Sequence, residues 1–189
     1  VEIPTRSYAR RFDGESSYVE TPVIYDGSHP ITLEAWVLWQ EPREGAVLLC
    51  DRSDRDGLFL GAFKSELSLQ VALNGEVGGV KGLLTDLPTA TTPHHVAGIF
   101  ADQTLTAYID GHYIASHPVS GTFTPSPVPF MIGAYPGEGE MPGFLYSGLF
   151  YLARISNCER YTGDFTPETS FEPDKETMAL YNFDEGVGD

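Results

Sequence analysis

HHVAGIFADQTLTAYIDGHYIAS, residues His94 to Ser116, is the stretch of this sequence that decides the fold. Apolar residues recur at every second position in three short segments, and the pairs Asp102-Gln103 and Asp110-Gly111 separate these segments. Period-two alternation places successive side chains on opposite faces of a strand, and Asp-Gly is a typical two-residue hairpin turn. The stretch therefore predicts a β-meander, three consecutive antiparallel strands.

The same alternation continues on both sides of this stretch. Ile31, Leu33, Ala35 and Val37 alternate with four other residues, which predicts a strand over 31–38. Helical spacing is absent, and 20 Gly and 14 Pro disfavour helices. The sequence thus predicts an all-β protein, an antiparallel jelly-roll β-sandwich of two sheets. Its further expected strands are 17–21, 46–50, 58–63, 67–73, 130–132, 149–155 and 179–183.

Length and charge limit the classes of partner. The 189 residues fit one domain, 1–189, and 41% hydrophobic residues can form a packed core. The net charge of −16 repels phosphate backbones and anionic lipids, so we expect neither a nucleic acid nor a membrane partner. Apolar runs are far shorter than the roughly 20 residues of a membrane span.

Only two cysteines are present, Cys50 and Cys158. The sequence leaves open whether they form a disulfide or remain buried thiols. Neither has a CxxC or histidine-rich neighbourhood, which argues against zinc and redox chemistry.

Three acidic residues resemble a catalytic array. Glu172, Asp174 and Glu176 would share one face if they lay on a strand, as the carboxylates of some glycan hydrolases do. Pro173 interrupts the segment, and no β-branched or aromatic residue separates the acids, so we predict a solvated acidic loop. No GxSxG or nucleotide-binding loop occurs, and the sequence predicts no enzyme and no catalytic residue.

Five blocks in order resemble one family. They are RFDGESSYVETP (residues 11–22), ITLEAWV (31–37), HHVAGIF with LTAYIDGHYIAS (94–116), FMIGAY (130–135) and SGLFYLARIS (147–156). Together they resemble laminin-G-like domains of the concanavalin A-like lectin/glucanase superfamily. The resemblance implies two antiparallel sheets of six or seven strands, non-catalytic binding of glycans or glycoproteins, and often a calcium ion at one edge. The final ALYNFDEGVGD resembles a strand that opens such domains, so we expect it to pair near the N-terminal strand or to begin a further segment.

The calcium motifs of this resemblance are altered. Ser16 and Ser17 stand where the family commonly has two Asp, and Tyr151 and Leu152 stand where it commonly has Asp-Glu. Hydroxyl and phenol groups cannot supply the missing charge to a hard cation. Asp13 remains as a weak metal ligand, so calcium is the single cofactor that the sequence leaves open.

These observations predict a lectin-like binding or interaction module for carbohydrate or glycoprotein, within a larger exported protein. The resemblance places it outside the cell, in the periplasm or at the cell surface. Two alternatives stay open: a polysaccharide hydrolase or lyase of the same fold, and a structural module that packs on neighbouring domains. For a glycan we expect a rim of acidic loops and aromatic rings, formed by Asp51, Asp54, Asp56, Tyr135, Glu138 and Tyr146.

Overall fold

The computed structural model describes residues 8–39, 45–53, 55–63, 66–75, 80–86, 91–136 and 142–184. Within these ranges every regular element is a β-strand. No helix among them is long and apolar enough to cross a membrane.

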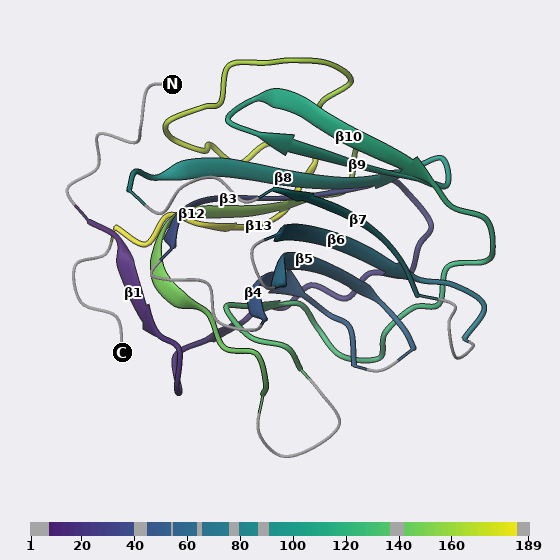
Figure 1. Cartoon of the computed structure of the whole chain (residues 1–189), viewed down its shortest axis with the longest axis horizontal. Coiled ribbons are helices and arrows are strands. Elements are labelled where there is room, and N and C mark those ends of the chain that lie inside the picture. The colour runs from purple at the N-terminus through teal and green to yellow at the C-terminus, as the bar shows by residue number, and fades with distance from the viewer. Residues whose placement is uncertain are drawn as a thin grey trace.

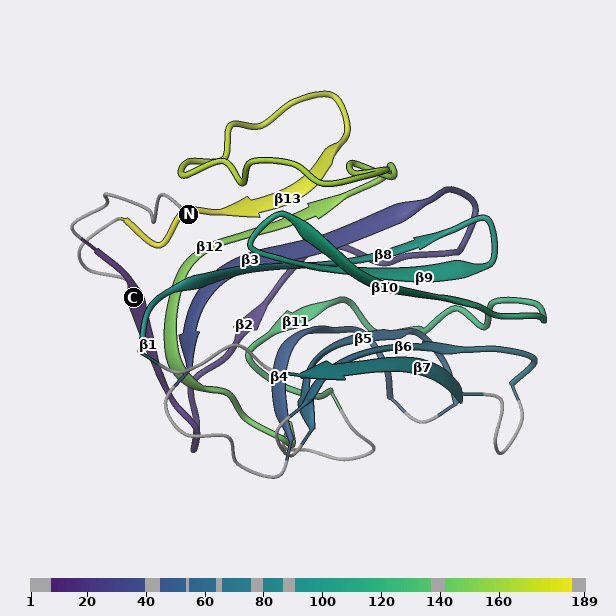
Figure 2. The ribbon, with the colours of Figure 1, turned by 45° about the horizontal axis from the view of Figure 1, so that its top comes forward.

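The strands form two antiparallel sheets that pack face to face (Figures 1 and 2). The seven-stranded sheet has the order β1 (Arg10–Asp13), β12 (Ser147–Ser156), β3 (Ile31–Trp39), β8 (His94–Ala101), β9 (Thr104–Ile109) and β10 (His112–Pro118), and β13 (Thr177–Tyr181) also pairs with β12. The six-stranded sheet has the order β2 (Val19–Glu20), β11 (Met131–Ile132), β4 (Ala46–Cys50), β5 (Leu58–Phe63), β6 (Glu66–Ala72) and β7 (Val80–Asp86). The all-β sandwich predicted from the sequence is confirmed.

The predicted meander is β8, β9 and β10. Its two turns contain Asp102, Gln103 and Asp110 with φ of 45°, 56° and 53°. Positive φ at the centre of a two-residue turn matches the right-handed twist of the flanking strands. The local sequence therefore sets both the strand pairing and the position of the Asp102-Gln103 turn at the end of the sandwich.

Alternating residues of facing strands form the core between the sheets. Ile31, Leu33 and Val37 of β3 point into it and have at most 1% exposed surface. They pack with buried residues of the six-stranded sheet, among them Leu60 and Leu69. Burial of this apolar surface is the main stabilising contribution to the fold.

The outer face of the seven-stranded sheet is buried too along its central strands β3, β8 and β12. Residues 157–176, which we call the covering segment, lie across it, and Figure 2 shows this segment in yellow-green above the sheet. The Trp36 indole donates a hydrogen bond to the Glu168 carbonyl oxygen at 2.8 Å, and Phe171 is fully buried against Trp36. For this reason β3 is buried on both faces, although it belongs to an antiparallel sheet, and its outward face carries the buried polar residues Thr32 and Glu34 beside Trp36.

Two strands, β1 and β7, were not predicted from alternation. The sequence of β1 is RRFD, with a single large apolar residue, and that of β7 is VKGLLTD, where Gly82 interrupts the pattern. The C-terminal strand agrees with the expectation that it pairs near the N-terminal one. It joins residues 153–156 of β12, while β1 joins residues 147–150 of the same strand.

The cysteine alternatives are also settled by the structure. Cys50 and Cys158 are both free thiols, and Cys50 is fully buried. Burial raises the pKa of the Cys50 thiol well above its ordinary value. A disulfide therefore makes no contribution to this fold.

Candidate functional site

Three connections meet at one end of the sandwich, on the right in Figure 1, and enclose a pocket of about 270 Å³. They are the β2–β3 loop, the β8–β9 turn and the connection from β10 to β11. The Val119 amide donates to the Gln103 carbonyl oxygen at 2.8 Å, which ties two of these connections together. We call this the end pocket, and the lining residues that matter below are Tyr25, His29, Phe100, Asp102, Gln103 and Phe123.

Aromatic rings form one wall of the end pocket, where Phe123 is partly exposed and Tyr25 and Phe100 support it from behind with 1% and 8% exposed surface. The Phe123 ring centroid lies 5.0 Å from that of Tyr25 and 5.9 Å from that of Phe100. The His29 ring meets Tyr25 edge-on at 5.3 Å, and the Tyr25 hydroxyl donates a hydrogen bond to the His29 carbonyl oxygen. Such contacts fix ring positions, so this wall is formed before any ligand arrives.

Polar groups lie at the rim of the pocket. Asp102 and Gln103 are exposed on their tight turn. His29 Nδ1 lies 2.8 Å from the Pro30 carbonyl oxygen, which only accepts, so Nδ1 carries the ring proton. In the neutral imidazole Nε2 is then an acceptor. A carboxylate, an amide and an imidazole thus line the rim.

The turn before β3 shapes this pocket. Gly27 has φ of +80°, and a Cβ built on it would lie 2.5 Å from Cδ1 of Phe123. Asp26 accepts a hydrogen bond from the Ser28 amide at 2.9 Å, which closes the turn, and hydrogen bonding by the Ser28 side chain, followed by that of its amide, lowers the pKa of the Asp26 carboxyl. Glycine is therefore required for Phe123 to reach its place in the wall.

Carboxylates make the surroundings of the pocket negative. Burial raises the pKa of the Tyr25 hydroxyl, and the charges of Asp26 and Asp51 raise it further. Of the described lining residues, none is a lysine or an arginine. The pocket therefore combines an apolar wall with a rim that is rich in acceptors and lies in a negative field.

The predicted rim residues on the β4–β5 loop have structural contacts instead. Asp51 has no exposed surface, so its expected role at a surface rim is wrong. Its Oδ1 accepts from the Leu58 amide at 2.6 Å, whereas Oδ2 is buried without a partner, and burial raises its pKa to about 7. Asp56 accepts from the amide and the hydroxyl of Ser53. These contacts hold the hairpin loop closed.

The predicted aromatic residues divide into a surface ring and a core ring. Tyr135 is half-buried and donates to the Ser53 carbonyl oxygen at 2.8 Å. Tyr146 is fully buried and donates to the Leu38 carbonyl oxygen at 3.0 Å, so its expected place in a ligand site is wrong. Tyr146 packs with hydrophobic residues in the core, whereas the sequence led us to expect it on a loop at the rim. Asp54 and Glu138 lie outside the described residues.

Phe144 is an exposed ring near Tyr135. Its side chain is 53% exposed, its φ is +47°, and its ring meets that of Tyr135 edge-on at a centroid distance of 5.8 Å. A bulky residue seldom adopts positive φ, and such strain persists only when surrounding contacts enforce it. Neither Tyr135 nor Phe144 lines the end pocket.

Asp13, the expected metal ligand, is bonded within its own turn. Oδ1 accepts from the amides of Glu15, Ser16 and Ser17, and Oδ2 accepts from the Ser16 hydroxyl. These bonds hold the pKa of the Asp13 carboxyl far below its usual range. Among the described residues no group of three His, Cys, Asp or Glu side chains is arranged to hold a metal ion.

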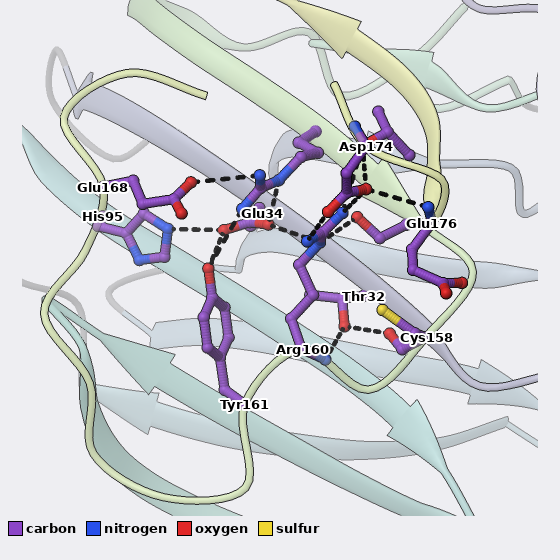
Figure 3. Close-up of polar contacts among 12 residues, drawn as sticks. Thr32, Glu34, His95, Cys158, Arg160, Tyr161, Glu168, Asp174 and Glu176 are labelled. Carbon is purple, nitrogen blue, oxygen red and sulfur yellow. Dashed lines mark hydrogen bonds and ion pairs between the residues drawn. The ribbon is translucent and has the colours of Figure 1, made fainter. Parts of the chain in front are cut away.

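The acidic array near the C-terminus lies in a turn outside any strand, as predicted. Asp174 accepts from two guanidinium nitrogens of Arg160, at 2.9 and 3.0 Å, and from the Thr177 hydroxyl. Glu172 is exposed, and the Glu176 carbonyl oxygen accepts from the Asn157 amide at 2.9 Å. The Arg160–Asp174 and Asn157–Glu176 contacts join the two ends of the covering segment, and Thr177 links Asp174 to β13 (Figure 3).

Glu34 is the centre of a second polar cluster, which lies under the covering segment (Figure 3). Its Oε1 accepts from Arg154 Nε at 2.8 Å, and its Oε2 accepts from the Tyr161 hydroxyl at 2.8 Å and from His95 Nε2 at 3.0 Å. Burial acts to raise the pKa of Glu34, but the bond from His95 and the charge of Arg154 outweigh it and lower that pKa. Since Glu34 has no exposed surface, a substrate cannot reach it.

Sequence reasoning missed the end pocket. The sequence predicts a turn at the Asp102-Gln103 pair, but no pattern shows that residues 119–123 lie beside this turn. Their proximity follows from the bridge between Leu73 and Phe123 and from the Val119–Gln103 hydrogen bond. These contacts join residues far apart in sequence, which local alternation cannot reveal.

Comparison with solved structures finds the same fold in carbohydrate-binding proteins. A Bacteroides ovatus protein proposed to bind carbohydrate is 17% identical, with a TM-score of 0.70, and the match covers 98% of this chain and 53%, about half, of that chain. The CBM40 of Ruminococcus gnavus IT-sialidase, bound to α2,3-sialyllactose, is 10% identical, with a TM-score of 0.60, covering 79% of this chain and 89% of that one. Domain 4 of the Geobacillus stearothermophilus extracellular arabinanase AbnA, in complex with arabinotriose, is 18% identical, with a TM-score of 0.60, covering 78% and 69%.

At these identities the likeness shows a shared fold and leaves ligands open. No curated protein matches the sequence at a significant level. A laminin G family model, described as the concanavalin A-like lectin/glucanases superfamily, matches residues 13–159, which is more than half of the chain. The expected family is thereby confirmed: this chain belongs to the concanavalin A-like lectin/glucanases superfamily.

Proposed function

We propose that this protein is a non-catalytic carbohydrate-binding module that holds one sugar ring in the end pocket. The observation that carries the proposal is the pairing of an aromatic wall with exposed acceptors at the end of a rigid sandwich. Sugar rings present C–H faces that pack on aromatic rings and hydroxyls that bond polar groups. Both kinds of partner are present in this one pocket.

The size of the pocket supports a single ring. Its volume of about 270 Å³ lies just below the roughly 300–1,000 Å³ of pockets for drug-sized ligands. An oligosaccharide would therefore extend beyond it, with one residue seated between Phe123 and the Asp102-Gln103 turn. The solved relatives that contain sialyllactose and arabinotriose support glycan as the ligand class.

Binding without catalysis is supported by the state of the carboxylates. Retaining glycosidases need two carboxyl groups about 5–5.5 Å apart beside the substrate. Glu34 is buried, and Asp174 is paired with Arg160. In the end pocket Asp102 is the single carboxylate among the described lining residues. We place the module in an exported protein, outside the cell, where glycans and glycoproteins are its partners.

A glycan array probed with the labelled domain tests this proposal. We expect selective binding to a subset of glycans, and we expect Gln103→Ala to weaken it by about tenfold, because the loss of hydrogen bonds in a small site costs on the order of 1–2 kcal/mol. Incubation of bound glycans with the protein should release no products.

The matched control is Glu172→Ala, because Glu172 is exposed and lies on the covering segment, outside the end pocket. This variant should bind as the wild type does. The proposal is wrong if no glycan binds to the wild type, or if Gln103→Ala and Glu172→Ala bind equally well. Cleavage of a bound glycan would instead support the hydrolase alternative.

A further inference from the structure

The end pocket offers mostly acceptors to a ligand. The Asp102 carboxylate only accepts, and the Nδ1–H of His29 is already used by the Pro30 carbonyl oxygen. Gln103 contributes an amide that both donates and accepts. The Tyr25 hydroxyl proton is used by the His29 carbonyl oxygen. A ligand must therefore supply donors of its own.

The negative charge around the pocket also disfavours ligands that carry a carboxylate. Asp26 lies on the turn that forms one side of the pocket, and it raises the pKa of Tyr25 together with Asp51, after the larger effect of burial. The chain as a whole carries −16. A negative field in a partly enclosed site lowers the local concentration of anions.

We propose that the end pocket binds a neutral sugar ring and discriminates against sugars that carry a carboxylate. This inference rests on the proposed carbohydrate-binding function and names the ligand class of the same site. Hydroxyl groups can donate to Asp102, whereas a carboxylate only accepts and would be desolvated beside like charge. Specificity thus arises from repulsion of the wrong ligand as well as from contacts with the right one.

The relatives do not determine this preference. One is bound to sialyllactose, which contains an acidic sugar, and another to arabinotriose, which is neutral. At 10% and 18% identity the likeness extends to the fold alone. The charge of the ligand must therefore be read from this chain's own pocket.

Asp102 is the residue that we expect to set the discrimination. It is exposed at the rim, and its φ of 45° lies in the left-handed region, where asparagine is also well tolerated. Asp102→Asn therefore removes the charge, keeps an acceptor oxygen and adds a donor at the same place. Glu172→Gln, on the covering segment, removes one charge at a residue that does not line the pocket and serves as the matched control.

The test uses pairs of ligands that differ only in a carboxylate. Methyl glucoside and methyl glucuronide, with the corresponding galactose pair, are titrated into ¹⁵N-labelled protein at low salt while amide shifts are followed. We expect the neutral member of at least one pair to shift amides of 27–29 and 101–103 and to bind at least about tenfold more tightly than its uronide. The ratio of the uronide's dissociation constant to that of the neutral sugar should decrease as salt screens the charges. In Asp102→Asn this ratio should fall toward one.

Each result has a defined meaning. A uronide that shifts the same amides and binds as tightly as its neutral partner overturns this inference and leaves the carbohydrate-binding function in place. If the Asp102→Asn variant still prefers the neutral sugar to its uronide by the full factor, then Asp102 does not set the discrimination. If neither class shifts the pocket amides and the glycan array is also negative, the proposed function itself fails. Glu172→Gln should match the wild type throughout.

Discussion

The two polar regions of this sandwich differ in how their groups are paired. Under the covering segment, each carboxylate oxygen of Glu34 has a donor within 3.0 Å, and the group has no exposed surface. At the end pocket, the side chains of Asp102 and Gln103 are exposed beside an aromatic wall. In the first region the Glu34 oxygens have their hydrogen bonds within the protein, although His95 Nδ1 is buried there without a partner, while the second region presents polar groups to a ligand.

This difference teaches how to separate structural from functional polar groups. A buried ion pair that loses one partner leaves an uncompensated charge, so the cluster at Glu34 affects stability most. Polar groups at an exposed rim cost little to replace, so changes there affect binding most. The predictions below test this division, beginning with the largest expected effect.

Glu34→Ala should destabilise the protein by about 3–5 kcal/mol, because it leaves the Arg154 guanidinium and the His95 ring without their shared acceptor. Urea unfolding followed by tryptophan fluorescence measures the change, since Trp36 packs on this side of the sheet. Glu172→Ala, at an exposed position, should stay within about 0.5 kcal/mol of the wild type. A loss below about 1 kcal/mol for Glu34→Ala would show that the cluster is not the structural region described above.

Asp51 gives a pH-dependent prediction in the loop beside the end pocket. Its folded-state pKa of about 7 lies above the ordinary 3.8, so the folded state keeps a proton that the unfolded chain releases. Stability from this group is therefore present below about pH 4 and is lost as the pH rises through about 7. The difference between the folded and unfolded pKa values of Asp51 corresponds to about 4 kcal/mol of unfolding free energy.

Asp51→Asn isolates this contribution. Asn keeps an oxygen for the Leu58 amide and cannot ionise, so the wild type should lose stability relative to the variant between about pH 4 and pH 8. Chemical unfolding at intervals across that range measures the difference. Parallel curves for the two proteins would mean that Asp51 titrates normally and that its buried oxygen has found a partner.

The strands were largely predictable because their information is local. Alternation and turn pairs placed 46–50 and 58–63 at the observed bounds of β4 and β5, and the meander at β8 to β10. Apolar residues at period two fix which face is buried without reference to distant parts of the chain. Strand β1 was not predicted because its sequence, RRFD, has a single large apolar residue. This residue, Phe12, is buried beside the neighbouring strand β12.

The candidate site was less predictable, for a physical reason. Tyr146 and Asp51 have residue types that suit a glycan rim, yet packing with Phe150 and bonding to the Leu58 amide direct them inward. The end pocket depends on Phe123 meeting Tyr25, a contact between distant loops. Residue type reports what a side chain can do, whereas exposure depends on long-range contacts.

Gly27→Ala should disturb the end pocket as well as lower the stability of the sandwich. A Cβ at φ of +80° is strained and would lie 2.5 Å from Cδ1 of Phe123, so we expect a loss of about 1–3 kcal/mol and displacement of the aromatic wall. Glycan binding should weaken by about tenfold or more, as measured by titration at a temperature where the variant is folded.

The matched control is Gly163→Ala, because nothing lies within 4 Å of a Cβ at Gly163. That variant should be close to the wild type in both stability and binding. If Gly27→Ala bound glycan as the wild type does, the wall formed by Phe123 would not belong to the binding site.

Calcium should produce the smallest effect of all. The Asp13 carboxylate already accepts from three amides and one hydroxyl, and a cation at that carboxylate would have to displace these donors or share its oxygens with them. Saturating a real site at about 100 times its dissociation constant would add about 2.7 kcal/mol, which raises the melting temperature by several degrees in a domain of this size. We expect melts in EDTA and in millimolar calcium to agree within about 1 °C, well below that rise. A clear increase of the melting temperature in calcium that persists in Asp13→Asn would point to an ion held elsewhere. An increase that disappears in this variant would show that Asp13 exchanges its internal hydrogen bonds for a metal, as the end pocket is expected to exchange water for a ligand.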